Sequence, residues 1–237
     1  MSGHTMKAFD AELQELAREI ADMGALAERQ IGDAVTALTR RDVALARRVV
    51  AADAGLDRLQ LDIEEKAILT IARRQPMAVD LRGIVAVLRI ANGLERMGDY
   101  AKNIAKRVVA AGGEIGPLPI PRGLQHMADL VLAALKAVLD AYARLDVTQA
   151  LAVWHGDAEI DALNHSLFRE LLTYMMEDAR NIPACTHLLF CAKNIERIGD
   201  HATNIAESVY YVATGVALDT ERPKTEMSGI AGQRLEP

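Results

Sequence analysis

Two copies of one eleven-residue motif carry the side chains best suited to chemistry in this sequence. They read Glu-Arg-Met-Gly-Asp-Tyr-Ala-Lys-Asn-Ile-Ala at residues 95–105 and Glu-Arg-Ile-Gly-Asp-His-Ala-Thr-Asn-Ile-Ala at residues 196–206, with eight of eleven positions identical. In a helix, the four-residue spacing of Glu, Asp and Asn places all three on one face. Like charges at this spacing disfavour a helix, and glycine costs a further ~1 kcal/mol relative to alanine. A chain that contains this combination twice has a use for it, and binding a cation through oxygen ligands is the obvious one.

A second pair of carboxylates precedes each motif, at Asp53 and Asp57 and again at Asp157 and Asp161. If the chain folds back at Pro76, residues whose numbers add up to about 152 lie level along the helical hairpin. The pairs 57 with 95 and 53 with 99 meet this condition, and the pairs 161 with 196 and 157 with 200 do so about a turn near residue 179. Four acids at one level repel each other and raise each other's pKa values unless a cation lies among them.

The sequence therefore predicts one metal site in each half. The predicted ligands are Glu95, Asp99, Asp53 and Asp57 in the first half, and Glu196, Asp200, Asp157 and Asp161 in the second. The alternative is that neighbouring helices turn these acids to different faces, because sequence gives the level along a hairpin and not the rotation of each helix.

Ligation by oxygen atoms alone suits magnesium, manganese, calcium or iron and fits zinc or copper poorly. We expect iron, manganese or magnesium. His165 follows Asp161 by one helical turn, but the first half has Leu61 at the equivalent position, so a ligand role for His165 stays open. His201 directly follows Asp200 and is expected to point elsewhere, to solvent or to a helix contact.

Composition indicates an all-α protein. Hydrophobic residues make up 51% of the 237 residues, charged residues 25% and aromatic residues only 4%. A net charge of −6 and the absence of a basic cluster argue against a nucleic-acid surface. No stretch approaches the ~20 apolar residues of a membrane span, so we expect a soluble, cytoplasmic protein. Cys185 and Cys191 have no zinc spacing and are expected to be reduced residues in or near the core.

Apolar residues recur at three- and four-residue steps through six segments, and the pattern of the first half returns in the second at an offset of 104 residues. This pattern predicts two tandem, pseudo-symmetric three-helix bundles built from six long helices. The predicted units are a first bundle at 7–110, a linker rich in glycine and proline at 111–121, a second bundle at 121–212, and a mobile tail at 213–237.

No catalytic machinery is visible. A ferritin-like di-iron enzyme needs Glu-x-x-His, and no Glu or Asp here has His three residues later. A hydrolase lacks its nucleophile elbow, its glycine-rich phosphate loop and its His-Glu-x-x-His motif. The remaining alternative to a metal protein is a structural helical adaptor. In that case Gly98 permits close helix packing, and the acids pair with Arg96 or Arg197 or form contact surfaces without metal.

The doubled motif, the upstream Asp-x-x-x-Asp, the opening Ala-Phe-Asp-Ala-Glu-Leu at 8–13 and Gln-Pro-Met-Ala-Val-Asp-Leu-Arg at 75–82 together resemble the PhoU family. The resemblance extends over residues 6–212. It implies two similar three-helix bundles, with metal clusters at the acidic motifs. The motif acids Glu95, Asp99, Glu196 and Asp200 match by position, and so do the upstream acids.

The resemblance also implies a function. Members of this family are regulators of high-affinity phosphate uptake that damp phosphate-starvation signalling when phosphate is plentiful. They are thought to link the ATPase subunit of the phosphate ABC transporter with a membrane sensor histidine kinase. For this chain the resemblance implies the same negative regulation, the same partners, a homodimer, and contact with the membrane only through the partners.

Overall fold

The structure is a computed structural model that describes residues 2–112 and 120–218. Within these ranges the chain forms helices and turns and contains no strand. The elements are α1 (Ser2–Arg40), α2 (Val43–Ala52), α3 (Ala54–Arg74), α4 (Val79–Ala111), α5 (Arg122–Arg144), α6 (Val147–Glu177), the short 3-10 helix η1 (Ala179–Asn181) and α7 (Ile182–Thr214). Together α2 and α3 occupy the place of the second of the six predicted long helices, so the predicted all-α class and helix order are confirmed.

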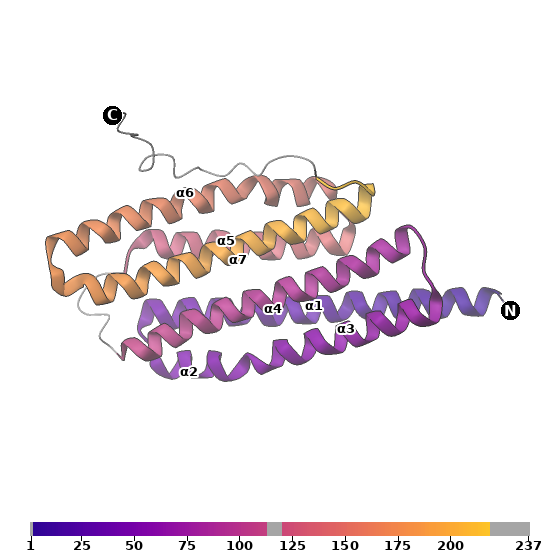
Figure 1. The fold of residues 1–237 in the computed structure, drawn as a ribbon, viewed down its shortest axis with the longest axis horizontal. Helices are drawn as coiled ribbons and strands as arrows, with labels where there is room; N and C mark the ends of the chain where they lie inside the picture. Colours follow the sequence, from indigo (N-terminus) through magenta and orange to yellow (C-terminus); the bar gives the residue numbers. More distant parts are fainter. Residues whose placement is uncertain (1, 113–119, 219–237) are drawn as a thin grey trace, which may run out of the picture.

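The helices form two three-helix bundles that lie side by side (Figure 1). The first bundle contains α1, α2 with α3, and α4, and the second contains α5, α6 and α7. The bundles meet where α4 packs on α7 and α1 packs on α5. Consequently α3 and α6 are the outer helices at opposite edges of the molecule, and each contacts only helices of its own bundle.

Equivalent aspartates, Asp42 and Asp146, cap the N-termini of α2 in the first bundle and α6 in the second. Asp42 accepts a hydrogen bond from the backbone N–H of Leu45 at 2.9 Å, and Asp146 accepts one from Gln149 at 3.0 Å. Each carboxylate thereby satisfies one of the N–H groups that the first turn of a helix leaves without a partner. The internal repeat predicted from the sequence is therefore present in the helix caps as well.

The two halves differ at the upstream acids, because the first half has a helix break there. The N–H of Leu56 bonds to the carbonyl of Asp53 at 2.9 Å, and the side-chain amide of Gln30 on α1 donates to the Ala52 carbonyl at 3.0 Å. The side chain of Gln30 thus satisfies a carbonyl at the break between α2 and α3. In the second half α6 runs without a break through Asp157.

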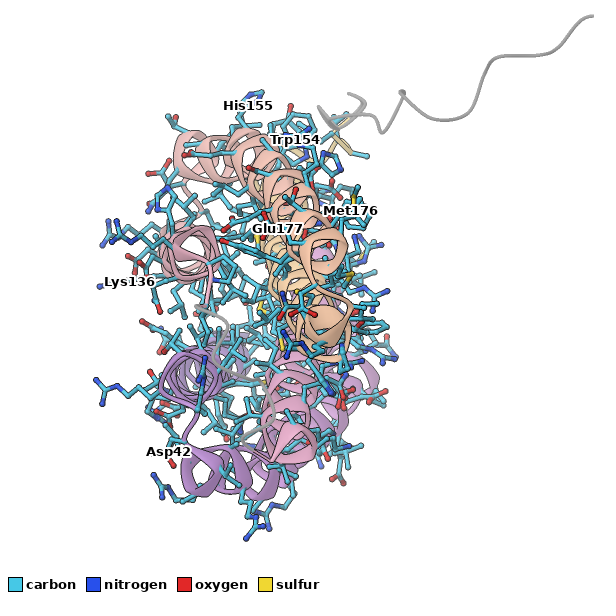
Figure 2. The ribbon with its side chains drawn as sticks, turned by 90° about the vertical axis from the view of Figure 1, so that its left-hand side faces the viewer. Asp42, Lys136, Trp154, His155, Met176 and Glu177 are labelled. Atoms are coloured by element: carbon cyan, nitrogen blue, oxygen red, sulfur yellow. The ribbon has the colours of Figure 1, made fainter. Side chains whose placement is uncertain are left out.

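Side chains fill the space between the helices, as the view along the bundle axes shows (Figure 2). The core is continuous through both bundles and includes Leu56, Leu94 and Met97 in the first and Leu135, Leu188 and Ile195 in the second. Cys185 and Cys191 are buried and free, as expected, and burial raises the pKa of the Cys191 thiol to about 12.

The glycine of each motif lies where the outer helix comes close. A Cβ atom added at Gly98 would overlap Cδ1 of Leu56, which is completely buried, and one added at Gly199 would lie 3.1 Å from Cδ1 of Ile160. These glycines therefore let the outer helices pack tightly against α4 and α7 at the level of the acidic residues.

The expected tail begins inside α7, which continues to Thr214, and residues 219–237 of that tail lie outside the described residues. The linker expected at 111–121 likewise falls mostly in the undescribed residues 113–119. In the part of the chain that the structure describes, no helix is long and apolar enough to cross a membrane.

We predict that Gly98→Ala lowers the free energy of unfolding by about 1–2 kcal/mol, because overpacking of the buried Leu56 outweighs the gain in helix propensity. Gly83→Ala in the same helix is the matched control, since a Cβ there meets no atom within 4 Å. The control should raise stability by about 0.5–1 kcal/mol. Urea unfolding followed by circular dichroism measures both changes, and equal stabilisation by the two substitutions would contradict the close packing.

Candidate functional site

In the first half, a lysine lies between two of the predicted metal ligands. Lys102, one turn after Asp99 on α4, donates to Asp99 Oδ1 at 2.6 Å and also pairs with Asp53, which is 6% exposed at the break between α2 and α3. Burial alone would lower the pKa of Lys102, but the two carboxylates outweigh burial and hold it above its ordinary value. Asp53 and Asp99 are thus brought together as predicted, and an ammonium group bridges them.

Glu95 lies beside this bridge, on the same face of α4 as Asp99. Partial burial raises the pKa of Glu95, and the nearby charges of Asp99 and Asp57 raise it further. Arg96 opposes this effect, with its Nε 3.7 Å from Glu95 Oε2 and its Nη1 3.8 Å from Asp99 Oδ2, but it is largely exposed. All four acids of the first half therefore lie within electrostatic reach of this group, with Asp57 acting on Glu95 and Asp53 joined to Asp99 through Lys102.

In the second half, Glu196 is the central acid of the group. It is 7% exposed, accepts a hydrogen bond from Lys193 at 2.5 Å through Oε1, and has a buried Oε2 for which the structure provides no hydrogen-bond partner. Burial raises the pKa of Glu196, Lys193 lowers it, and the charges of Asp200 and Asp161 raise it. These effects show that α6 and α7 bring Asp161, Asp200 and Glu196 within electrostatic reach of each other.

The remaining predicted residues are placed as follows. Asp157 is buried on α6, one turn before Asp161. His165 lies half-buried one turn after Asp161, and no contact of His165 decides whether it is a ligand. His201 packs against the ring of Tyr100 with 5.7 Å between ring centroids, so it faces a helix contact.

The two halves place different lysines beside their acids, and one of the three positions at which the motifs differ accounts for the lack of a counterpart to Lys102 in the second half. Residue 102 in the first copy corresponds to Thr203 in the second, which is fully buried and donates to the Gly199 carbonyl at 3.0 Å. The second half therefore has no lysine between its acids at that place. Lys193 contacts one oxygen of Glu196 and is itself about half exposed.

Analysis of the sequence missed both lysines, although one visible signal pointed to the first. Lys102 stands inside the repeated motif, at i+3 from Asp99, a spacing at which oppositely charged side chains meet on a helix. Of the two arginines that the adaptor alternative named as partners of the acids, Arg96 does pair with Glu95 and Asp99. The guanidinium of Arg197 instead lies 5.7 Å from the centroid of the Tyr100 ring.

The residues of the second half fit a hard metal ion better than those of the first. A buried carboxylate oxygen without a partner, close to two further carboxylates, is a site where a cation would relieve an energetic cost. Nevertheless, no group of three or more His, Cys, Asp or Glu side chains among residues 2–112 and 120–218 is already arranged to hold a metal ion. The assignment of the eight acids as ligands stays a prediction.

Comparison with protein families gives two matches that coincide with the two bundles. The model of the PhoU domain matches residues 20–108 and again residues 124–209, and each matched segment contains one acidic motif. The chain belongs to the PhoU family. Two PhoU domains in tandem account for the internal repeat and for the pseudo-symmetry of the fold.

Relatives match over nearly the whole chain. The phosphate-specific transport system accessory protein PhoU homolog of Rhizobium meliloti (strain 1021) is 57% identical over 229 residues, which cover 97% of each chain. The homolog of Caulobacter vibrioides (strain NA1000 / CB15N) is 52% identical over 228 residues, which cover 96% of this chain and 99% of the homolog. The crystal structure of PhoU from Pseudomonas aeruginosa superposes with a TM-score of 0.83 at 39% identity, with coverage of 88% of this chain and 100% of that chain.

The phosphate transport system regulatory protein PhoU from Streptococcus pneumoniae also superposes with a TM-score of 0.83, at 29% identity over 90% of this chain and all of that chain. PhoU proteins are thus accessory and regulatory proteins of phosphate transport. This family membership confirms the prediction that the chain is not an enzyme.

We predict that Glu196→Gln stabilises the metal-free protein at pH 7. Because the folded state holds the Glu196 proton more tightly than the unfolded chain, wild-type stability falls as pH rises above the ordinary Glu value of 4.5. Removing this buried charge should gain about 1 kcal/mol, or about 2–4 °C in Tm, and reduce the loss of stability between about pH 4.5 and 7.

Thermal unfolding in a chelator across that pH range measures the effect. Glu159→Gln, at an exposed position of the neighbouring helix α6, is the charge-matched control and should leave Tm nearly unchanged. A lower Tm for Glu196→Gln at pH 7 would show that Lys193 already compensates the buried carboxylate fully.

Proposed function

We propose that this protein is a cytoplasmic negative regulator of phosphate uptake and of phosphate-starvation signalling. The observation that carries the proposal is the match with PhoU accessory proteins over nearly the whole length of both chains, at up to 57% identity among the relatives named above. A match of this extent includes both bundles and both acidic motifs, so the regulatory role is proposed for the complete two-bundle unit.

The regulator acts, in this proposal, as an adaptor between the ATPase subunit of the phosphate ABC transporter and its sensor histidine kinase. Its charge of −6 suits protein partners with basic surfaces better than it suits nucleic acid. Contact with the membrane occurs only through these partners. The homodimer implied by the resemblance remains a prediction.

Metal binding at the acidic motifs is the finer part of the proposal. Glu196 with Asp200, Asp161 and Asp157 would hold the ion in the second half, and Glu95 with Asp99, Asp57 and Asp53 in the first. Iron, manganese or magnesium are the ions that oxygen ligands of this kind favour. A bound cation would neutralise the repelling carboxylates and join the outer helix to its neighbour.

The two sites are not equivalent in this proposal. Lys102 already supplies a positive charge between Asp53 and Asp99, so a metal ion in the first half must displace or repel an ammonium group. The second half has Thr203 instead and leaves an oxygen of Glu196 without a hydrogen-bond partner. We therefore propose that metal binds the second half more tightly.

The lysine bridge also favours a second candidate function for the first half. With Lys102 in place, Asp53 and Asp99 are compensated without metal and can serve as packing and contact surface of a purely structural adaptor. The two candidates predict different effects of removing Lys102. In a structural adaptor the removal should weaken a bridge between helices, whereas in a metal protein it should open a metal site.

Metal content measured by elemental analysis tests the proposal after the protein is loaded with iron, manganese or magnesium and dialysed. Glu196→Gln with Asp200→Asn should lose most of the bound metal, whereas Glu95→Gln with Asp99→Asn should lose less. Lys102→Thr, which gives the first motif the residue of the second, should raise metal affinity of the first half about tenfold or more by removing a neighbouring positive charge.

Helical circular dichroism of every variant provides the control for folding. Absence of metal from the wild-type chain with all three ions would leave the acids as contact surface of an adaptor. Equal loss from the two double variants would contradict the ranking of the two sites and leave metal binding itself intact.

The regulatory role predicts a result in cells. In a bacterium that lacks its own PhoU gene, this chain should restore repression of a phosphate-starvation reporter at high phosphate, because the proposed adaptor transmits the state of the transporter to the kinase. Unchanged reporter activity with normal protein levels would contradict the proposed role, whatever the metal content.

A further inference from the structure

A cleft of about 490 Å³ opens between α4 and α7. The two helices lie side by side and run in opposite directions, and the cleft lies toward the end of their contact at which α4 begins and α7 ends (Figure 1). Arg89 and Gly93 line it from α4, and His201, Glu207 and Ser208 line it from α7. A cleft of this volume falls in the usual range of small-molecule sites.

The two ends of this contact have different residues at equivalent positions. At the other end, the Cζ atom of Arg107 on α4 lies 3.8 Å from the centroid of the Phe190 ring on α7. The internal repeat has an offset of 101 residues here, so Ser208 on α7 is the counterpart of Arg107, and Arg89 on α4 is the counterpart of Phe190. A small hydroxyl group thus replaces an arginine, and an arginine replaces the aromatic ring.

Gly93 enlarges the cleft further, because its counterpart in the second half is Asn194. A Cβ atom added at Gly93 would meet Ile205 Cγ1 at 3.7 Å and His201 Nδ1 at 3.8 Å, so a larger side chain there would extend along these residues. Residues 89, 93 and 208 of the cleft thus depart from the pseudo-symmetry of the two bundles.

The cleft presents a positive group beside aromatic rings. Arg89 is the only arginine or lysine among the described residues that line it, and its Cζ lies 5.9 Å from the centroid of the Tyr211 ring. A guanidinium beside a ring can still donate its N–H groups to an oxyanion such as phosphate. Asn92 and His201 add polar groups that can bond to a planar ligand.

One carboxylate also lines the cleft. Glu207 accepts a hydrogen bond from the indole N–H of Trp154 on α6 at 3.2 Å through Oε1. A carboxylate repels a bare anion, but it accepts hydrogen bonds from sugar hydroxyl groups, as acidic residues do in nucleotide sites. The cleft thus combines an arginine for an anionic group with a carboxylate for hydroxyl or amino donors.

We propose that this cleft binds a mononucleotide. Arg89 holds the phosphate group, Glu207 accepts from the ribose hydroxyl or base amino groups, and the base lies against the Tyr211 and His201 rings. A single arginine matches one phosphate group better than a triphosphate. Inorganic phosphate alone would fill little of the volume and would leave the Tyr211 and His201 rings without a base to contact. The proposal goes beyond the regulatory function and does not depend on metal binding.

Isothermal titration of the full-length chain with adenosine monophosphate tests the proposal, and fluorescence provides a second readout. The sequence contains one tryptophan, Trp154, and its indole is bonded to a residue of the cleft, so binding should change its emission. We expect a dissociation constant below about 1 mM. Adenosine and inorganic phosphate, each lacking one half of the ligand, should bind at least about tenfold more weakly.

Two variants and a control complete the experiment. Arg89→Met should weaken binding about tenfold or more through loss of the phosphate contact, and Gly93→Leu should weaken it by filling the cleft. Arg47→Met, at an exposed position on α2, removes the same charge away from the cleft and should leave binding unchanged. Circular dichroism verifies that the variants fold.

Three results would overturn the proposal. These are no heat and no fluorescence change with adenosine monophosphate, binding that Arg89→Met leaves unaltered, and binding of inorganic phosphate as tight as that of the nucleotide. None of them bears on the cell-based test of the regulatory function, so the two proposals fail separately.

Discussion

Repulsion among carboxylates is the constraint on which the rest of this structure depends. In each bundle the outer helix and its neighbour bring acids together at one level, where burial raises the pKa of Glu95 and of Glu196 and nearby acids raise it further. The motif glycines allow this close approach, because a Cβ at Gly98 would overlap the buried Leu56. Packing of the bundles and the electrostatic cost of the acids are therefore linked at the same positions, and positive charge must be supplied there.

The two halves supply that charge differently, although their motifs are nearly identical. In the first half Lys102 bridges Asp53 and Asp99, and the helix break at Asp53 accompanies this contact. In the second half Thr203 bonds to its own helix, and Glu196 keeps an oxygen without a partner in the structure. A duplicated fold thus has two acidic groups with different surroundings, because a lysine bridges two acids in the first half and a buried threonine takes its place in the second.

The two ends of the contact between α4 and α7 likewise differ, although the repeat relates their residues. Tyr100 and His201 are equivalent positions of the repeat, and their ring centroids lie 5.7 Å apart. Because equivalent residues meet at a twofold axis, the pseudo-twofold axis passes near this pair. On one side Arg107 lies over the Phe190 ring, and on the other Arg89 and Ser208 line a cleft. Because this contact joins the two bundles, a ligand bound there would influence how one bundle is held against the other.

The sequence by itself determined the helical class, the repeat and the level at which the acids meet, because periodicity and spacing act along the chain. It also carried the motifs by which the family was identified. Only the tertiary structure decided the rotation of each helix about its axis, and therefore which acid meets Lys102, which oxygen of Glu196 is left without a partner, and where the helix contact leaves a cleft. These outcomes depend on contacts between segments such as Gln30 and Ala52 that lie far apart in the chain, and no local spacing encodes them.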